Sequence, residues 1–198
     1  MKIGLTGSIA CGKSTVSGYL RELGYFVADA DAISRSLTAP GGQALPLLRE
    51  AFGDGIFDGD VLSRQRLGSL VFSDAEKRGQ LNAILHPLII RTVHDELAAH
   101  DAPGTLVFGD VPLLYECGMA HMFDRVFVVS ASRETQIARL LARDGLSRED
   151  AQRRIDAQMP LERKRALADA VIDSDGSIEN TRAQVRALID SIFPRRKA

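Results

Sequence analysis

The chain has 198 residues, of which 45% are hydrophobic and 26% are charged, and its formal net charge is −1. This balance excludes a strong field that would attract nucleic acid or an anionic membrane, and no apolar run approaches the ~18 residues of a membrane span. The two cysteines, Cys11 and Cys117, are too few for a disulfide framework, and the first motif begins too early for a signal peptide. We therefore expect one cytoplasmic domain, monomeric and without an obligatory protein partner.

The predicted elements alternate between strands and helices. Residues 2–6 (KIGLT) have the apolar character of a short buried strand, residues 14–24 the pattern of a helix that ends at a glycine, and residues 25–29 that of a second strand. Helical patterns separate the remaining strand-like segments, which are residues 105–111, 125–131 and 169–173. This alternation predicts an α/β fold with a doubly wound, parallel, five-stranded sheet.

Two segments interrupt the alternation. Residues 31–103 are mostly helical in pattern, with joints rich in Gly, Pro and Asp, and we expect an inserted substrate-binding subdomain there. Residues 137–167 are rich in arginine, and residues 147–150 (SRED) form a capping-box pattern that predicts a helix start. A basic helical hairpin is typical of a lid that closes over phosphates, and equally of a solvated face on which arginines pair with acids. The nucleotide core then comprises about residues 1–30, 104–136 and 168–198.

Residues 7–14 (GSIACGKS) match the phosphate-binding pattern G-x-x-x-x-G-K-[ST] at every fixed position, between a predicted strand and a predicted helix. Gly7 and Gly12 permit backbone torsions that turn successive N–H groups toward a phosphate. Lys13 is expected to reach the β- and γ-phosphates, and the hydroxyl of Ser14 is expected to bind Mg²⁺. The sequence therefore predicts a site for a nucleoside triphosphate with Mg²⁺. The other ATP-binding residues expected around this loop are Ala10, Cys11 and Thr15.

Carboxylates follow two of the predicted strands, with Asp29 and Asp31 after the second and Asp110 at the end of the third. The carboxyl ends of parallel strands meet at one edge of a sheet, where ligands bind. Transfer of a phosphoryl group to a hydroxyl benefits from a carboxylate that orients the acceptor and accepts its proton. Asp31 or Asp29 can serve as this base, although Asp31 can instead cap a helix. Asp110 can hold Mg²⁺ through water or position the acceptor, and spacing alone does not decide between Asp31 and Asp110.

Several segments occur in the order seen in the dephospho-CoA kinases, which the chain resembles over nearly its full length. Besides the phosphate loop they include VADADAISR, LNAILHPLI and DVPLLYE. The resemblance implies a P-loop kinase-like fold with a nucleotide core, a helical CoA-binding insert and a mobile lid. It also implies a transferase that uses ATP and Mg²⁺ to phosphorylate the ribose 3′-hydroxyl of dephospho-CoA, which is the last step of coenzyme A biosynthesis.

The resemblance assigns roles to particular residues. Asp31 matches the family's base for the 3′-hydroxyl, and Thr6 matches the threonine just before the loop. Arg139 and Arg143 match lid-side arginines that neutralise the transferring phosphates. The remaining residues that it places at the acceptor site are Arg64, His86 and Asp110. From its setting alone, before a proline and among apolar residues, His86 is more typical of a structural hydrogen-bonding residue.

The chain departs from the family pattern in two places. Its phosphate loop has Ser8, Ala10 and Cys11 where the family usually reads G-G-I-G-S-G-K-S, and Ala10 can narrow the backbone geometry there. Cys11 is open to two interpretations, a reactive thiol with a lowered pKa at a helix N-terminus or simply a small side chain. Near the C-terminus, Ser174 begins the turn that ends at Gly176 where the family usually has N-D or N-G. We expect both residues to line the adenine pocket, with the base recognised mainly through backbone contacts.

Two other functions are less well supported. A shikimate-type or nucleoside-monophosphate kinase does not account for the long helical segment 31–103. A GTP-dependent switch needs a guanine-selecting N-K-x-D motif, and the sequence contains no Asn-Lys pair.

Overall fold

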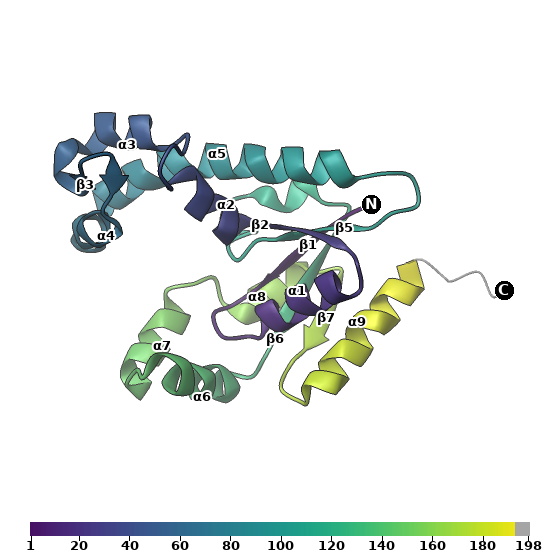
Figure 1. Cartoon of the computed structure of the whole chain (residues 1–198). Helices are drawn as coiled ribbons and strands as arrows, with labels where there is room; N and C mark the ends of the chain where they lie inside the picture. The colour runs from purple at the N-terminus through teal and green to yellow at the C-terminus, as the bar shows by residue number, and fades with distance from the viewer. Residues whose placement is uncertain (193–198) are drawn as a thin grey trace. The chain divides into compact units, whose positions relative to one another are not determined.

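A computed structural model describes residues 1–192, with a central sheet in the strand order β2-β5-β1-β6-β7 (Figure 1). The strands are β1 (Lys2–Gly7), β2 (Phe26–Asp29), β5 (Val107–Asp110), β6 (Arg125–Ser130) and β7 (Ala170–Asp173). β1 pairs in parallel with both β5 and β6, and β6 pairs in parallel with β7. The predicted doubly wound α/β sheet of five strands is confirmed.

β1 occupies the middle of the sheet because its residues can be buried on both faces. Ile3 and Leu5 on one face have no exposed surface, and Gly4 and Thr6 on the other face are buried as well. A strand that is buried on both faces suits a parallel sheet with helices above and below it. The register places Leu5 opposite Asp110, the last residue of β5. The carboxyl-terminal half of β1 therefore lies beside Asp110 of the neighbouring strand.

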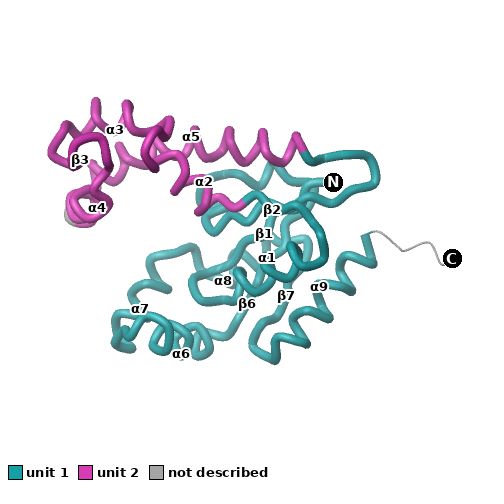
Figure 2. The backbone as a smooth tube through the Cα atoms, viewed as in Figure 1, with its two compact units in different colours: residues 1–28, 100–198 teal, residues 29–99 magenta. Residues whose placement is uncertain are grey.

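The chain divides into two compact units, which are residues 1–28 together with the chain from residue 100 onward, and residues 29–99 (Figure 2). We call them unit 1 and unit 2. Besides the central sheet, unit 1 holds a short 3₁₀ turn (Met119–Met122) and five helices among its described residues. These helices are α1 (Lys13–Glu22), α6 (Arg133–Asp144), α7 (Arg148–Asp156), α8 (Leu161–Leu167) and α9 (Ile178–Ile192).

Unit 2 is mostly helical, but it also contains a small hairpin that the sequence analysis did not anticipate. Its helices are α2 (Ala30–Leu37), α3 (Leu45–Phe52), α4 (Arg64–Ser73) and α5 (Ala75–His100). The chain returns to unit 1 at His100, the last residue of α5. After a 3₁₀ turn (Asp54–Ile56), the strands β3 (Phe57–Asp58) and β4 (Val61–Leu62) pair antiparallel. Because these strands have two residues each, they leave little periodic signal in the sequence.

The predicted arginine-rich segment forms α6, α7 and α8. Ser147 accepts a hydrogen bond from the Asp150 N–H and begins α7, as the capping-box pattern predicts. Ile137, Leu140 and Ala151 form a small buried cluster between α6 and α7, and Ile9 and Ala10 of the phosphate loop pack against it. The apolar seam of this hairpin therefore reaches the loop that follows β1.

Substitution of Phe108 on β5 measures how much this buried side chain contributes to the stability of unit 1. Its side chain has no exposed surface, whereas that of Phe72 on α4 is 88% exposed. We expect Phe108→Ala to lower the free energy of unfolding by about 3–5 kcal/mol, because it removes a buried ring and leaves a cavity. Chemical denaturation measures the change. Phe72→Ala is the matched control, and a comparable loss in both variants would contradict the described core.

Candidate active site

The phosphate loop (residues 7–14) joins β1 to α1, and glycine is required at its two fixed positions for different reasons. A Cβ on Gly7 would overlap Sγ of Cys11 and the carbonyl oxygen of Val129. Gly12 is the N-cap of α1 and has φ 83°, in the left-handed region that side chains rarely adopt. The first turn of α1 offers backbone N–H groups that have no helical acceptor, at the positive end of the helix dipole. This arrangement can bind an anion such as a phosphate.

Three successive carbonyl groups of the loop each accept a hydrogen bond from a side chain outside it. The three bonds are Gln136 Nε2 to Ile9 O (2.7 Å), Arg139 Nη1 to Ala10 O (3.2 Å) and Ser174 Oγ to Cys11 O (2.6 Å). In addition, the Ile9 N–H donates to Oε1 of Gln158 at 2.8 Å. These bonds fix the loop backbone from α6, from the residues after α7 and from the turn after β7. The sequence does not predict the roles of Gln136 and Gln158, because an isolated glutamine in a helical pattern gives no signal of its partner.

Ala10 adopts φ 59°, and it is the single non-glycine residue with a positive φ in the described part of the chain. The sequence analysis expected that an alanine here can narrow the loop's geometry. Instead the loop keeps a left-handed conformation at this residue. For a residue with a Cβ this conformation costs roughly 1–2 kcal/mol. Packing against the α6–α7 cluster and the bond from Arg139 hold the residue in place.

Cys11 is a small buried side chain, and its interpretation as a reactive thiol is wrong. It is only 1% exposed and belongs to the main hydrophobic core of unit 1. Burial raises the pKa of its thiol, an effect that the hydrogen bond from the Lys13 backbone and the charges of Lys13 and Lys164 oppose without reversing. The helix N-terminus therefore does not produce a thiolate here, because desolvation outweighs it.

Lys13 of the phosphate loop and Asp110 of β5 form an ion pair between Nζ and Oδ1. Their side chains are 17% and 5% exposed. The pair follows from the topology, because Lys13 begins α1 just after β1 and Asp110 ends the adjacent strand β5. The structure thus brings together two predicted site residues that are far apart in the sequence.

A cavity of about 500 Å³ opens beside the loop, and most of the predicted ATP-binding residues line it. We call it the loop cavity. The predicted residues that line it are Ala10, Gly12, Ser14, Thr15, Arg139, Arg143, Ser174 and Gly176. Ala142, Ile178 and Thr181 also line it and were not predicted. Of these, Ile178 stands out in the structure, because it is an apolar side chain that is 55% exposed in the first turn of α9 instead of being packed in the core.

Arg139 and Arg143, the two arginines that the sequence predicts on the lid side, have different partners at the loop cavity. The Arg139 guanidinium donates to the carbonyl and hydroxyl oxygens of Ser174 as well as to the loop. Arg143 makes a two-bond pair with Asp144, with distances of 2.7 and 2.9 Å, and this guanidinium lowers the pKa of the Asp144 carboxyl. Ser174 is 5% exposed, and its hydroxyl already bonds Cys11 and Arg139.

The residues expected at the acceptor site lie in both units. Thr6, in unit 1, is fully buried and its hydroxyl donates to the carbonyl of Pro112 at 3.0 Å. In unit 2, Nη2 of Arg64 donates to the hydroxyl of Thr38 at 3.1 Å. His86 is half-buried on α5.

The carboxylates of Asp29 and Asp31 occupy different positions at the start of α2. Asp29 is the N-cap of α2, where its Oδ1 accepts a hydrogen bond from the Ala32 N–H at 2.9 Å. The alternative that Asp31 caps this helix is therefore wrong. Asp31 instead lies in the first turn of α2 with an exposed side chain.

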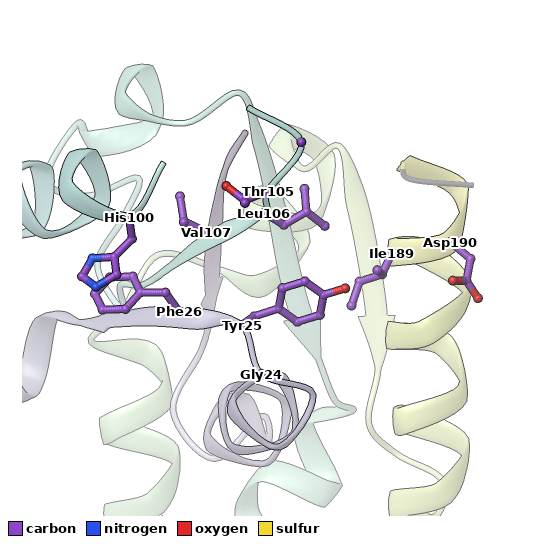
Figure 3. Close-up of a pocket in the computed structure, with 10 residues that line it drawn as sticks. Gly24, Tyr25, Phe26, His100, Thr105, Leu106, Val107, Ile189 and Asp190 are labelled. Carbon is purple, nitrogen blue, oxygen red and sulfur yellow. The ribbon is translucent and has the colours of Figure 1, made fainter. Parts of the chain in front are cut away.

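A second cavity, of about 510 Å³, lies at the opposite edge of the sheet, where β2 and β5 begin (Figure 3). Tyr25, Phe26 and His100 line it, and the His100 ring stacks on that of Phe26 with centroids 3.5 Å apart. None of the predicted site residues lines it. The carboxyl ends of the strands, rather than this edge, carry the predicted chemistry.

No helix among the described residues 1–192 combines the length and the apolar character needed to cross a bilayer. Within the same residues, no three His, Cys, Asp or Glu side chains gather closely enough to hold a metal ion by themselves.

The sequence matches the family model for dephospho-CoA kinases over residues 1–180. The chain belongs to the dephospho-CoA kinase family. Two relatives that carry this name are the dephospho-CoA kinases of Shouchella clausii and Symbiobacterium thermophilum. The first is 44% identical over 187 residues, covering 93% of this chain and 95% of the relative. The second is 49% identical over 187 residues, covering 93% of this chain and 78% of the relative.

Solved structures agree with this membership of the dephospho-CoA kinase family. The crystal structure of TT1252 from Thermus thermophilus has a TM-score of 0.82 and 38% identity, and the match covers 98% of each chain. The dephospho-CoA kinase from Campylobacter jejuni has a TM-score of 0.74 and 27% identity over the whole of both chains. A shikimate kinase from Acinetobacter baumannii, at 16% identity and a TM-score of 0.58, shares the fold.

The left-handed backbone of Ala10 predicts an unusual response to glycine. We expect Ala10→Gly to stabilise the protein by up to about 1 kcal/mol, since glycine adopts a positive φ without a steric cost. Ala183, exposed on α9, is the matched control, and Ala183→Gly should destabilise by about 0.5–1 kcal/mol because it loosens a helix. Urea denaturation measures both. Equal destabilisation by the two substitutions would show that Ala10 is unstrained.

Proposed function

We propose that this member of the dephospho-CoA kinase family transfers the γ-phosphoryl group of ATP to the ribose 3′-hydroxyl of dephospho-CoA, which yields CoA and ADP. The observation that carries the proposal is a complete phosphate loop that has a cavity beside it and whose lysine is ion-paired with Asp110. Family membership supplies the acceptor, since the phosphate loop alone occurs in many nucleotide-binding proteins.

On the nucleotide side, we assign the phosphates to the N–H groups of the first turn of α1 and to Lys13. Thr15 and Gly176 line the same cavity, and the backbone near Gly176 is available to the adenine base. The Ser174 hydroxyl is committed to Cys11 and Arg139, which supports recognition of the base through backbone contacts. Ile178 provides an apolar surface for one face of the base.

The residues present at the loop also fit a Mg²⁺ ion. Ser14 lines the cavity, and Asp110 adds a carboxylate that is paired with the adjacent residue, Lys13. Oxygen donors of this kind are what Mg²⁺ prefers, and the ion usually arrives with the phosphates rather than in a protein cage of its own. When bound, Mg²⁺ neutralises negative charge on the phosphates during transfer.

On the acceptor side, we assign the base to Asp31. Its carboxylate is exposed in the first turn of α2, and Asp29 already serves as the cap, so Asp31 is left without that structural task. Unit 2 corresponds to most of the predicted insert 31–103, and we assign binding of dephospho-CoA to it. We assign further acceptor contacts to Thr6, Arg64 and His86, and to Asp110 through its place beside the transferred group.

We propose that the lid comprises residues 137–167, in which Arg139 and Arg143 act on the transferring phosphates. Both side chains line the loop cavity. Their guanidinium groups can stabilise charge on the equatorial oxygens of the phosphoryl group. Little covalent chemistry is required of the protein, so its contribution is mainly positioning and electrostatic stabilisation.

Identification of the product tests the function directly. We expect incubation with ATP, Mg²⁺ and dephospho-CoA to yield CoA, seen by mass spectrometry as the acceptor plus one phosphoryl group. Shikimate and nucleoside monophosphates serve as alternative acceptors and should remain unmodified. Phosphorylation of one of these compounds, with dephospho-CoA untouched, would overturn the proposal.

The assignment of Asp31 predicts a loss of turnover without a loss of nucleotide binding. We expect Asp31→Asn to lower kcat by at least ~10²-fold, because the 3′-hydroxyl loses the group that accepts its proton. The affinity for a non-hydrolysable ATP analogue, measured by calorimetry, should stay near that of the wild type.

Two controls bracket this prediction. Asp29→Asn removes the neighbouring carboxylate but keeps a residue that caps helices well, so it should affect kcat far less than Asp31→Asn does. Lys13→Ala should weaken both turnover and binding of the ATP analogue. If Asp29→Asn causes the larger loss of kcat, the base is Asp29 and the assignment to Asp31 is wrong.

A further inference from the structure

A lysine with no exposed surface lies beneath the phosphate loop, on α8. Nζ of Lys164 donates to the carbonyl oxygen of Pro112 at 3.1 Å and to that of Gly7 at 3.4 Å. It also forms an ion pair with Oε1 of Glu116 at 2.8 Å. An ammonium group has three donors, and these three acceptors match that number. The side chain belongs to the arginine-rich segment by sequence, yet it faces the interior of unit 1.

The acceptors of Lys164 belong to the two segments that bear the site. Gly7 is the last residue of β1 and the first of the phosphate loop. Pro112 comes two residues after Asp110, and its carbonyl also accepts the bond from Thr6. The Lys164 ammonium therefore ties the start of the loop, which carries Lys13, to the chain just beyond Asp110. These are the segments whose relative position sets the Lys13–Asp110 ion pair.

Stability alone is a poor explanation for this arrangement. Bringing a lysine and a carboxylate out of water carries a desolvation cost, and well-packed apolar side chains often stabilise such a site equally well or better. The charge of Lys164 is also felt at the loop, since it opposes the rise that burial causes in the pKa of Cys11. Because this buried cation bonds to both functional segments, it can instead fix their position relative to each other.

We propose that Lys164, paired with Glu116, is a positioning residue for phosphoryl transfer, which sets Asp110 and thereby Lys13 relative to the phosphate loop. The inference rests on the proposed function, because Lys13 and Asp110 are its means of action. Displacement of a reacting or supporting group by about 1 Å can cost on the order of 10²-fold in rate. The loss should appear in kcat rather than in nucleotide affinity, because the N–H donors of α1 keep their places.

The test is the double variant Lys164→Met/Glu116→Gln. It replaces the buried ion pair with uncharged groups of similar size, and the amide introduced at position 116 can donate to a carbonyl that the lysine no longer serves. Arg125→Met is the control, since it removes one positive charge from an exposed position at the start of β6, outside the proposed lid. Three quantities are measured in each protein: kcat with ATP and dephospho-CoA, the dissociation constant of an ATP analogue, and Tm.

We expect the double variant to melt near the wild-type Tm and to bind the ATP analogue within about 3-fold of the wild type, while its kcat falls by about 10- to 100-fold. Arg125→Met should retain wild-type kcat. A wild-type kcat in the folded double variant would overturn the inference, and so would losses of affinity and kcat that only follow the loss of Tm. If the double variant does not fold, Glu116→Gln alone decides, since it should lower kcat at unchanged analogue affinity, and an unchanged kcat would overturn the inference.

The same experiment separates this inference from the proposed function. A wild-type protein that does not phosphorylate dephospho-CoA contradicts the function itself. An active wild type whose kcat survives the loss of the Lys164–Glu116 pair contradicts only the positioning role.

Discussion

The phosphate loop has to present several backbone N–H groups to one anion, and it can do so only if its own carbonyls are bonded elsewhere. Backbone polar groups in a buried loop need partners, and an unengaged carbonyl would compete with the phosphate for the same donors. In this chain the carbonyls of Ile9, Ala10 and Cys11 are bonded by side chains of Gln136, Arg139 and Ser174. The geometry of the anion site therefore depends on α6 and on the turn after β7, as well as on the glycines of the loop itself.

This dependence changes the meaning of the arginine-rich segment. Several of its charges pair on the surface, as in the pairs Arg148–Glu134, Arg153–Asp150 and Arg133–Asp156. Exposed pairs of this kind contribute little to stability, and they match the solvated face that the composition also allowed. Of the charged side chains in the segment, only Arg139 and Arg143 line the loop cavity, while Lys164 is directed into the core. One stretch of sequence therefore combines a solvated face, a cavity wall and a buried clamp.

The fold and the phosphate loop could be predicted because their signals are local. Apolar runs mark the five strands, and the G-x-x-x-x-G-K-S spacing follows from the torsion at Gly12 and the tight space at Gly7. Tertiary contacts decided the rest. A helix start two residues earlier than the alternative made Asp29, rather than Asp31, the cap of α2. Burial in the core overrode the expected effect of a helix N-terminus on the pKa of Cys11. The partners of Lys164 lie 48 and more residues away in the sequence, beyond the reach of any local pattern.

The alanine at position 10 has a consequence for the loop before any nucleotide arrives. The Cβ of Ala10 favours negative φ, so the left-handed shape is a higher-energy conformation that the contacts around the residue have to maintain. Those contacts are the hydrogen bond from Arg139 and the packing against the α6–α7 cluster. Loosening the α6–α7 hairpin would let residue 10 return to its ordinary conformations and would turn the neighbouring N–H groups away from the anion.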